Sequence, residues 1–512
     1  MTETPEVSPA TMIPARLNDV TGLPKQVFLA VLVGLGLRLL LVLGFPASAG
    51  DTTLYLQLAR NLADHHVYGL WINGQLVPTD LRTPGYPAFL GGIALLLGRA
   101  IKPILLSQAV LDLGTCLLVA MLAQALAPPV ARRRVALAGL WLAATCPFVA
   151  NYSAVVLTEV LAAFLSTSAC LCFVLSVKGE TTEYTWKGRP FAMSSMSVAC
   201  FGAFLTGLAT LVRPEMPLLL ASAGVVLTLR RWKSLGWRKL ARLGVAMGAA
   251  FLLPMLPWAA RNFITLHEVQ FLAPRYATLP GEYAPLGYHA WTKTWLTRYR
   301  NVYGALWKIG DEPVETGELP ESAFDSPEEK ARAVALLEQY NASPNLDLSP
   351  QLDREFAEIA RERTARHPLR TFVWVPFQRA LTIWLTPRTE LLPSSAAIWP
   401  ISEHWDENPL DVLVAIFFAC LNYLYVGLAL GGIWVAWRAR GAIGSGEPSP
   451  EAANLWGIAL LVTYLTVRTA FLTTVEAPEP RYVVPCFPAV LALAALLWSR
   501  EICLHRNSKK GE

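Results

Sequence analysis

The sequence has few charged residues and lacks the motifs with which many soluble enzymes hold nucleotides. Asp, Glu, Lys and Arg together make up 16% of the 512 residues, and no Gly-Lys-Ser or Gly-Lys-Thr occurs that could cradle a phosphate. Gly34 and Gly36 lie inside an apolar run. The basic runs are short and alternate with apolar segments, which argues against nucleic-acid binding. We therefore expect neither nucleotide-driven chemistry nor a nucleic-acid partner.

The cysteines and histidines form no recognisable metal-binding or disulfide pattern. Of the eight cysteines, seven lie in or at the ends of apolar runs, and Cys503 lies in the basic C-terminal tail. Cys170 and Cys172 are two residues apart, which points them to different faces of a helix, so we interpret them as core residues. His65 and His66 are adjacent and point apart, which favours a solvated helix end over a metal site. We assign no metal ligands and no cofactor, and the sequence leaves a divalent metal undetermined.

Long apolar runs fill the rest of the chain, in which 54% of the residues are apolar. Many runs approach or exceed the roughly 20 residues that a helix needs to cross a hydrocarbon core about 30 Å thick. The pattern predicts an all-α polytopic membrane protein with about ten (10–12) transmembrane helices, external juxtamembrane helices and a small external domain. The expected spans lie at approximately 27–44, 104–127, 134–151, 155–177, 192–212, 214–230, 240–259, 410–437, 454–474 and 481–499.

Clusters of Lys and Arg predict the orientation of these spans, because cytoplasmic loops carry an excess of these residues. The clusters lie at 132–134, 178–189, 230–239, 438–440 and 506–510. Both termini then face the cytoplasm, and the first span is a retained anchor, since no small-residue cleavage site follows it. The expected regions are a cytoplasmic tail (1–26), a transmembrane module (27–259) with the first external loop at 45–103, an external cap region (260–409), C-terminal transmembrane helices (410–499) and a second cytoplasmic tail (500–512).

Two apolar segments are interrupted by proline, and whether they cross the membrane is left open. The segment 84–98 is short for a span, and 372–387 contains Pro376, Arg379 and Pro387. We expect the first to form a re-entrant or juxtamembrane helix and the second to lie at the interface.

A soluble block from Asp311 to His367 lies within the external cap region. Its second half is apolar at helical spacing, which predicts an amphipathic helix that contains Phe356, Ile359 and Arg363. Such a block could cover a site at the membrane surface.

The first external loop holds the most distinctive motif. Asp51, Tyr55 and Ala59 fall on one helical face, and Arg82-Thr83-Pro84-Gly85-Tyr86-Pro87 follows. Further motifs fall on the same predicted side of the membrane: Leu157-Thr158-Glu159, Leu211-Val212-Arg213-Pro214-Glu215 and Glu479-Pro480-Arg481-Tyr482. In this order the motifs resemble the polyprenyl-phosphate-dependent GT-C glycosyltransferases, the group of the protein O-mannosyltransferases and the aminoarabinose transferase of lipid A (glycosyltransferase family 39 type). The resemblance covers mainly residues 30–220.

The resemblance implies a GT-C type bundle in a bacterial inner membrane that transfers a sugar from a polyprenyl phosphate to an acceptor on the periplasmic or external face. Such a transfer needs a base for the acceptor's proton and a cation for the departing phosphate. By resemblance Asp51 is the base, the displacement inverts the anomeric centre, and Glu159 is a second catalytic carboxylate. The residues implied in phosphate binding are Arg82, Arg213 and Arg481, and those implied in substrate binding are Tyr55, Tyr86, Tyr482 and Asp80. Protein O-mannosyltransferases have an Asp-Glu pair where this chain has Asp51-Thr52, and Asp80 is the alternative base.

Structural roles compete with these assignments. Asp51 is also suited to be a helix N-cap. Glu159 could be the structural partner of an arginine, and Arg213 could form an ion pair with Glu215 at a helix junction. Arg481 could serve as an interfacial anchor.

The main alternative function is that of a secondary transporter or lipid flippase, and a third is that of an inactive assembly subunit. Transporters place charged residues and broken helices near the bilayer midplane, often in related halves. Here the candidate residues gather at span ends on one predicted side, which favours an enzyme. The sugar, the acceptor (glycolipid, lipopolysaccharide or protein) and the oligomeric state are undetermined.

Overall fold

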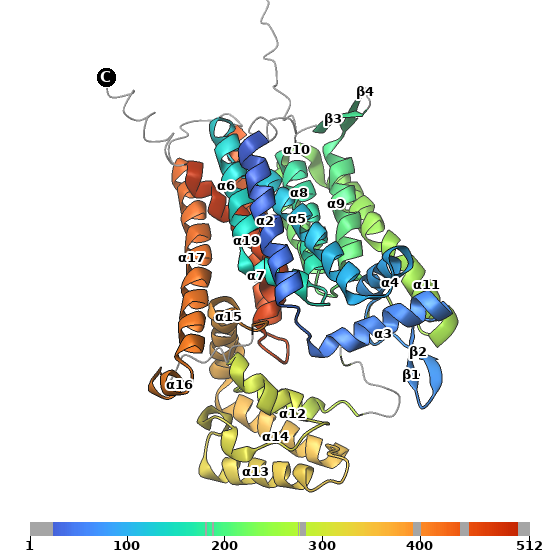
Figure 1. The fold of residues 1–512 in the computed structure, drawn as a ribbon, viewed down its shortest axis with the longest axis vertical. Coiled ribbons are helices and arrows are strands. Elements are labelled where there is room, and N and C mark those ends of the chain that lie inside the picture. Colours follow the sequence, from blue (N-terminus) through green and yellow to red (C-terminus); the bar gives the residue numbers. More distant parts are fainter. Residues whose placement is uncertain are drawn as a thin grey trace, which may run out of the picture.

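A bundle of long helices with a smaller helical unit at one end makes up the computed structural model (Figure 1). It describes residues 24–179, 182–186, 189–274, 276, 283–392, 401–440 and 450–499. Within these ranges the strands form only two antiparallel hairpins. The strands are β1 (Gly69–Ile72) with β2 (Gln75–Pro78), and β3 (Thr182–Trp186) with β4 (Arg189–Met193). The predicted all-α polytopic class is confirmed.

In the described part of the chain, seven helices are long and apolar enough to cross a membrane, or up to eight if a bent pair counts as one span. The bent pair joins α6 (Arg132–Thr145) to α7 (Pro147–Ala150) and the following turn at an angle of 51°. The seven contain α2 (Pro24–Gly44), α5 (Ile101–Leu126), α8 (Glu159–Lys178), α10 (Pro217–Leu252) with α11 (Leu256–Leu266), α17 (Pro409–Arg440), α18 (Pro450–Leu472), and the C-terminal run of η9 (Pro480–Cys486), α19 (Phe487–Ala494) and η10 (Ala495–Ser499).

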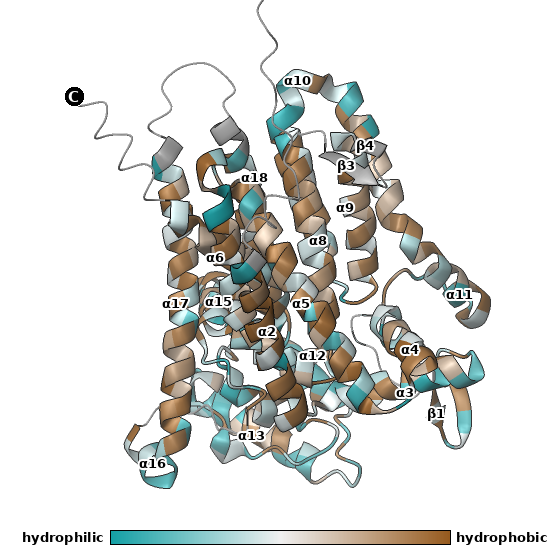
Figure 2. Cartoon of the chain, turned by 45° about the horizontal axis from the view of Figure 1, so that its top comes forward, coloured by the Kyte–Doolittle hydropathy of each residue, from teal (hydrophilic) through white to brown (hydrophobic). Residues whose placement is uncertain are grey.

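The difference from the predicted ten spans has physical reasons. Helix α9 (Ser195–Thr210) is apolar but has only 16 residues. Helices α10 and α11 count together as one apolar stretch of 50 residues. Within α10, however, Gly236 has φ 70° and ψ 161°, a conformation that glycine adopts without steric cost. Figure 2 shows the chain turning at the top of α10 and descending into α11, so the predicted spans 214–230 and 240–259 lie on the two sides of this break.

The segments predicted to be external gather at one end of the bundle. Figure 1 shows α3 (Gly50–His65), α4 (Gly85–Leu97) and the β1–β2 hairpin at this end, together with the helices α12 (Leu286–Lys293), α13 (Pro327–Asn341) and α14 (Pro350–Arg366). The β3–β4 hairpin, predicted to be cytoplasmic, lies at the opposite end. We call α12, α13 and α14 with their connections the external unit. Which end faces the periplasm stays a prediction.

The two proline-interrupted segments form short helices. Helix α4 has 13 residues, too few to span a bilayer. The second segment consists of η8 (Arg370–Trp374) and α15 (Val375–Leu385), which packs against η9, α17 and α18. Arg379 of α15 is buried, and its guanidinium donates to the backbone carbonyls of Leu296 and Val475, both at 2.8 Å. This segment therefore packs against the bundle, and Arg379 joins it to Leu296 in the connection between α12 and α13.

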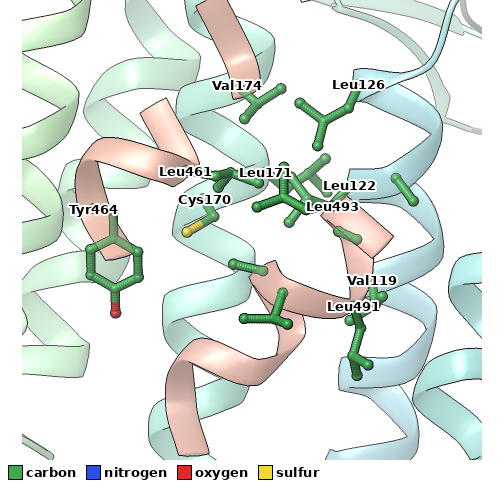
Figure 3. Packing of buried hydrophobic residues seen from close by; sticks show 14 of the residues in the cluster. Val119, Leu122, Leu126, Cys170, Leu171, Val174, Leu461, Tyr464, Leu491 and Leu493 are labelled. Atoms are coloured by element: carbon green, nitrogen blue, oxygen red, sulfur yellow. The ribbon is translucent and has the colours of Figure 1, made fainter. Parts of the chain in front are cut away.

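The bundle core is formed by α5, α8, α18 and α19, whose side chains point toward one another in Figure 3. Leu122, Cys170, Leu461 and Leu493 are buried there, and Cys172 is partly buried. Because lipid is as apolar as leucine, close packing drives association of such helices. A Cβ on Gly432 of α17 would lie 2.0 Å from the carbonyl oxygen of Leu493, so α17 approaches α19 more closely than any larger residue allows.

The external unit has its own aromatic core. Tyr288 and Trp291 of α12 pack on Phe356 of α14, with ring centroids 5.0 and 5.1 Å apart. The buried face of α14 includes Phe356, Ile359 and Arg363, as the helical spacing predicts. The α12–α14 approach is close, since a Cβ on Gly287 would lie 1.9 Å from the carbonyl oxygen of Asp353.

Candidate functional site

Helix α3 lies at the end of the bundle where the predicted external segments gather, and Asp51 is in its first turn. The N-cap is Ala49, whose backbone N–H donates to the Thr52 hydroxyl at 3.2 Å. The competing expectation that Asp51 is the N-cap is therefore wrong, because Ala49 and Thr52 form the cap between them. The Asp51 carboxylate is left for other partners.

Two arginines from distant parts of the chain hold Asp51. Arg82 donates from Nη2 to Oδ1 at 3.1 Å, and Arg481 donates from Nη2 to Oδ2 at 3.3 Å. Burial alone would raise the pKa of Asp51, but the positive charges of Arg481 and Arg82 outweigh burial and lower the pKa below its ordinary value. Asp51 is thus an ionised carboxylate at neutral pH, and its side chain is still 25% exposed.

The loop that carries Arg82 is fixed against the end of α9. The Gly85 N–H donates to the carbonyl of Leu211 at 2.7 Å, and a Cβ on Gly85 would lie 2.6 Å from that oxygen. Only glycine permits this approach, which brings the Arg82 motif beside the Arg213 motif. Tyr68 also donates from its hydroxyl to the Arg82 carbonyl at 2.8 Å. Two motifs that are far apart in sequence therefore meet in space.

Arg481 and Tyr482 share a buried carboxylate, Glu479. The Nε of Arg481 donates to one Glu479 oxygen, and the Tyr482 hydroxyl donates to the other at 2.8 Å. The Tyr482 ring has the guanidinium carbon of Arg213 at 5.4 Å and that of Arg481 at 5.6 Å from its centroid. Such cation–π contacts favour a fixed arrangement of both arginines.

Arg213 lies between two carboxylates. Its Nη1 donates to Glu159 Oε1 at 3.0 Å, and its Nε donates to Glu215 Oε1 at 2.7 Å. Glu215 also accepts from Arg468 Nη2 of α18 at 3.0 Å. Burial would raise the pKa of Glu215, but Arg213 and Arg468 lower it to about 2. Both structural contacts that competed with the functional assignment, Glu159 with an arginine and Arg213 with Glu215, are therefore present.

The remaining predicted residues differ in exposure. The rings of Tyr55 and Tyr86 meet edge to face with centroids 5.2 Å apart. Tyr86 is fully buried and donates to Gln108 Oε1 at 2.7 Å, so it supports α3 and does not line a surface. Asp80 is partly exposed, and within the described residues no hydrogen bond or ion pair joins it to Asp51. Nearby, Arg261 donates to the carbonyls of Tyr68 and Thr79, which flank the β1–β2 hairpin, at 2.6 and 3.0 Å.

Sequence reasoning missed three residues of this network. Glu479 belongs to a sequence motif that indicates no role for it, yet its carboxylate accepts from Arg481 and fixes that side chain. Arg468 lies within the apolar helix α18, where an intramembrane arginine is itself a signal of an internal partner. Glu215 was considered only as an ion-pair partner, yet it joins Arg213 to Arg468. We call the following eight side chains the Asp51 network: Asp51, Arg82, Glu159, Arg213, Glu215, Arg468, Glu479 and Arg481.

The charges of the Asp51 network balance. It contains the carboxylates of Asp51, Glu159, Glu215 and Glu479 and the guanidinium groups of Arg82, Arg213, Arg468 and Arg481. Of these eight side chains, Arg82 is the most exposed at 37% and is the one best placed to meet an anion from solution or the lipid surface. In the described residues no group of three His, Cys, Asp or Glu side chains could hold a metal ion.

The chain is thus a multi-pass all-α membrane protein with a carboxylate–arginine network at one end of its bundle. No family model matches it, and no curated protein matches its sequence. Solved structures of membrane enzymes do resemble it. The Archaeoglobus fulgidus oligosaccharyltransferase in complex with Zn and sulfate has a TM-score of 0.45 at 15% identity, with 94% of this chain and 51% of that chain covered.

Two further structures are similar. ArnT from Cupriavidus metallidurans bound to undecaprenyl phosphate has a TM-score of 0.37 at 15% identity, with 88% of this chain and 78% of that chain covered. Arabinosyltransferase EmbB from Mycobacterium smegmatis has a TM-score of 0.34 at 14% identity, with 97% and 42% covered. The chain spans about half the length of the oligosaccharyltransferase. At TM-scores below 0.5 these similarities do not assign the site or its chemistry.

Proposed function

We propose that the chain is a membrane glycosyltransferase that transfers a sugar from a polyprenyl-phosphate donor to an acceptor on the external face of a bacterial inner membrane. The observation that carries the proposal is the ionised, partly exposed carboxylate of Asp51 between Arg82 and Arg481. A base and two phosphate-binding cations thereby meet where an apolar bundle ends. The order of the sequence motifs, which resembles that of GT-C enzymes, supports the same proposal.

The proposed reaction is a single displacement. The acceptor hydroxyl oxygen forms a bond to the anomeric carbon while the bond from that carbon to the phosphate oxygen breaks, and the bonding electron pair leaves with the phosphate. The acceptor proton passes to Asp51, and because the oxygen attacks from the face opposite the departing phosphate, the anomeric centre is inverted. General-base catalysis of this kind contributes typically 10²–10⁴-fold.

The arginines have the second role, the stabilisation of the leaving phosphate. A guanidinium matches phosphate oxygens in a bidentate geometry, and a phosphate would replace the Asp51 carboxylate as partner of Arg82 or Arg481. Arg481 would keep Glu479 as its second partner, and Arg213 would keep Glu159. In this proposal Glu159 acts as the second carboxylate by positioning Arg213. Arrival of the donor therefore frees Asp51 from part of its ion pairing, which prepares it to accept a proton.

Donor turnover tests the proposal. The purified full chain in lipid vesicles is incubated with polyprenyl-phosphate sugars labelled in the sugar, and the release of polyprenyl phosphate is measured together with transfer of label to glycolipid or peptide acceptors. Glycosyl transfer predicts both products. Movement of the intact donor across the bilayer without any cleavage would identify a flippase and refute the proposal.

One observation bears on the transporter alternative. Arg38 of α2 and Asp112 of α5 form an ion pair inside the bundle at 2.7 Å, with both side chains buried. Arg38 also donates to the carbonyls of Gly34 and Ala144 at 3.0 and 2.9 Å. A pair held by so many fixed carbonyls is suited to join α2 to α5 and α6. A transporter would instead require Asp112 to exchange this partner, and the flipping measurement distinguishes the two.

A further inference from the structure

A second candidate binding site lies beside the Asp51 network. A cavity of about 380 Å³ opens where α2 ends, between the segment 45–48, the turn at 151–154 and the segment 390–392. The segment 45–48 is held in place by the Ala47 N–H, which donates to the Ala154 carbonyl at 2.9 Å. Ser48 lines the cavity three residues before Asp51, so their Cα atoms lie within about 11 Å of each other.

The acidic residue of this cavity is Glu390. Its Oε1 accepts from the Tyr152 hydroxyl at 3.0 Å, whereas its Oε2 has no hydrogen-bond partner among the described residues. The neighbouring Arg388 instead donates hydrogen bonds to the carbonyls of Pro480 and Ile383 and to the side-chain oxygen of Asn422. Burial raises the pKa of Glu390 more than the charge of Arg388 lowers it. A buried oxygen without a partner costs free energy, and because Oε2 is itself buried, a hydrogen-bond donor on a ligand recovers this cost only after a shift of the Glu390 side chain.

The polar lining of the cavity selects the kind of ligand. Besides Glu390, the polar side chains are Ser48 and Asn151, and among the residues that the structure describes no Lys or Arg is part of the lining. A hydroxyl and a carboxamide both donate and accept hydrogen bonds, as sugar hydroxyls do, whereas an ammonium group only donates. A phosphate would meet the Glu390 carboxyl group, and the nearby Arg388 is already bonded to Pro480, Ile383 and Asn422. The cavity thus favours a hydroxyl-bearing group and differs from the arginine-rich Asp51 network.

The remaining lining is apolar and continues onto the lipid-facing side of α2. Leu41, Phe45 and Leu391 line the cavity, and Phe45 is 59% exposed. Leu40 and Leu43 of α2 are likewise exposed. A ligand with an apolar tail could therefore leave the tail in the bilayer beside α2 while its head enters the cavity.

We propose that this cavity binds the hydroxyl-bearing head group of an amphiphilic acceptor of the glycolipid type, with Glu390 as the residue that selects it. The inference rests on the proposed function, because it assigns the acceptor side of the same reaction. The donor phosphate then binds at the arginines of the Asp51 network, and the acceptor hydroxyl approaches Asp51 from the cavity.

Protection of an introduced thiol tests the site directly. Ser48→Cys in the full-length protein in nanodiscs is alkylated with a maleimide, and the modified peptide is quantified by mass spectrometry with dodecyl β-glucoside or dodecyl phosphate present. We expect the glucoside to slow alkylation and the phosphate to have little effect. Adding Glu390→Gln should weaken the protection about tenfold, because a neutral amide oxygen accepts a weaker hydrogen bond than a carboxylate. Glu407→Gln on α16 (Ile401–Glu407), where the Glu407 side chain is 77% exposed, should not weaken it.

Equal protection by both amphiphiles, or protection that survives Glu390→Gln, would overturn the inference. Donor hydrolysis, the release of polyprenyl phosphate with water as acceptor, separates this outcome from failure of the proposed function. Glu390→Gln should raise the KM for dodecyl glucoside as acceptor about tenfold relative to the unsubstituted protein. Absence of both donor hydrolysis and sugar transfer in the unsubstituted protein refutes the proposed function, whatever the protection result.

Discussion

The Asp51 network and the external unit both pair carboxylates with arginines, but they differ in how completely the charges are enclosed. In the external unit Arg363 is fully buried and donates to Glu329, to the Thr294 hydroxyl at 2.9 Å and to the carbonyls of Ser322 and Ala323. Every side of its guanidinium is occupied. Arg82, in contrast, is 37% exposed and has Asp51 as its ion-pair partner.

This difference separates an ion pair that holds the fold from one that can exchange partners. A buried pair is costly to break because the remaining charge has no water to replace its partner. A partly exposed pair is worth little to stability, so a substrate can replace one member at low cost. We therefore expect substitutions in the two regions to affect different quantities, activity in one and stability in the other.

The largest expected effect is that of Asp51→Asn on transfer. The amide keeps the shape of the side chain and cannot accept the acceptor's proton, so the rate of transfer should fall about 10²–10⁴-fold, the usual range for loss of a general base. The thermal midpoint should change little, because the side chain is partly exposed. Radiolabelled sugar transfer and thermal unfolding in detergent measure the two.

Asp64→Asn is the matched control for this substitution. Asp64 lies on the same helix, α3, and pairs with the exposed Arg99 at 2.5 Å. Its replacement should leave transfer intact. If Asp51→Asn retains full transfer, Asp51 is not the base, and Asp80→Asn becomes the next variant to measure.

The second effect is on stability. Arg363→Met leaves Glu329 and Asp325 with only Arg366 and Arg370 as partners and should lower the free energy of unfolding of the external unit by about 3 kcal/mol. Transfer per folded molecule should stay unchanged. Arg332→Met is the control, because Arg332 pairs with Glu355, Glu358 and Glu362 on the surface and should matter by less than about 1 kcal/mol. Equal losses in both variants would contradict the comparison.

Sequence reasoning identified the helical class and the members of the Asp51 network better than their contacts. Asp51 and Arg481 are 430 residues apart, and their order along the chain and their predicted side of the membrane implied a common site. No periodicity could show that they touch, because the contact depends on how the fold places α3, which carries Asp51, beside η9, which carries Arg481. Arg468 lies within an apolar helix, and the sequence does not show that its partner is Glu215.

Local details of the backbone were harder to predict. Asp51 has good N-cap chemistry, yet Ala49 takes the position because the Thr52 hydroxyl satisfies its backbone N–H. The number of spans depends on Gly236, since one residue with positive φ decides whether 217–266 is one helix or two. Hydrophobic periodicity predicts that an apolar stretch is helical, but it does not predict where a long stretch turns.

The third effect is that of Arg82→Met on the leaving phosphate. Loss of one charged donor to a developing anion typically costs about 10²–10³-fold in kcat. Arg82→Lys should recover only part of this loss, because an ammonium lacks the bidentate geometry. Initial rates at saturating donor distinguish a kcat effect from weaker donor binding. A variant with unchanged kcat and a raised KM would assign Arg82 to donor binding alone.

The smallest expected effect is a shift of the acidic limb of the pH–rate profile. Arg481 and Arg82 lower the pKa of Asp51 below the ordinary aspartate pKa of about 3.9. Asp51 therefore stays ionised until the pH falls below that value. Transfer should therefore not decline between pH 8 and 5 through protonation of Asp51. In Arg82→Met one positive charge is lost, the pKa rises, and activity should disappear at a higher pH than in the unsubstituted protein. The activities of Arg82→Met and of the unsubstituted protein, each followed from pH 7 to below about pH 3.9 relative to its own maximum, measure the shift. An acidic limb that stays in place would mean that the group titrating in the reaction is not the carboxylate beside Arg82.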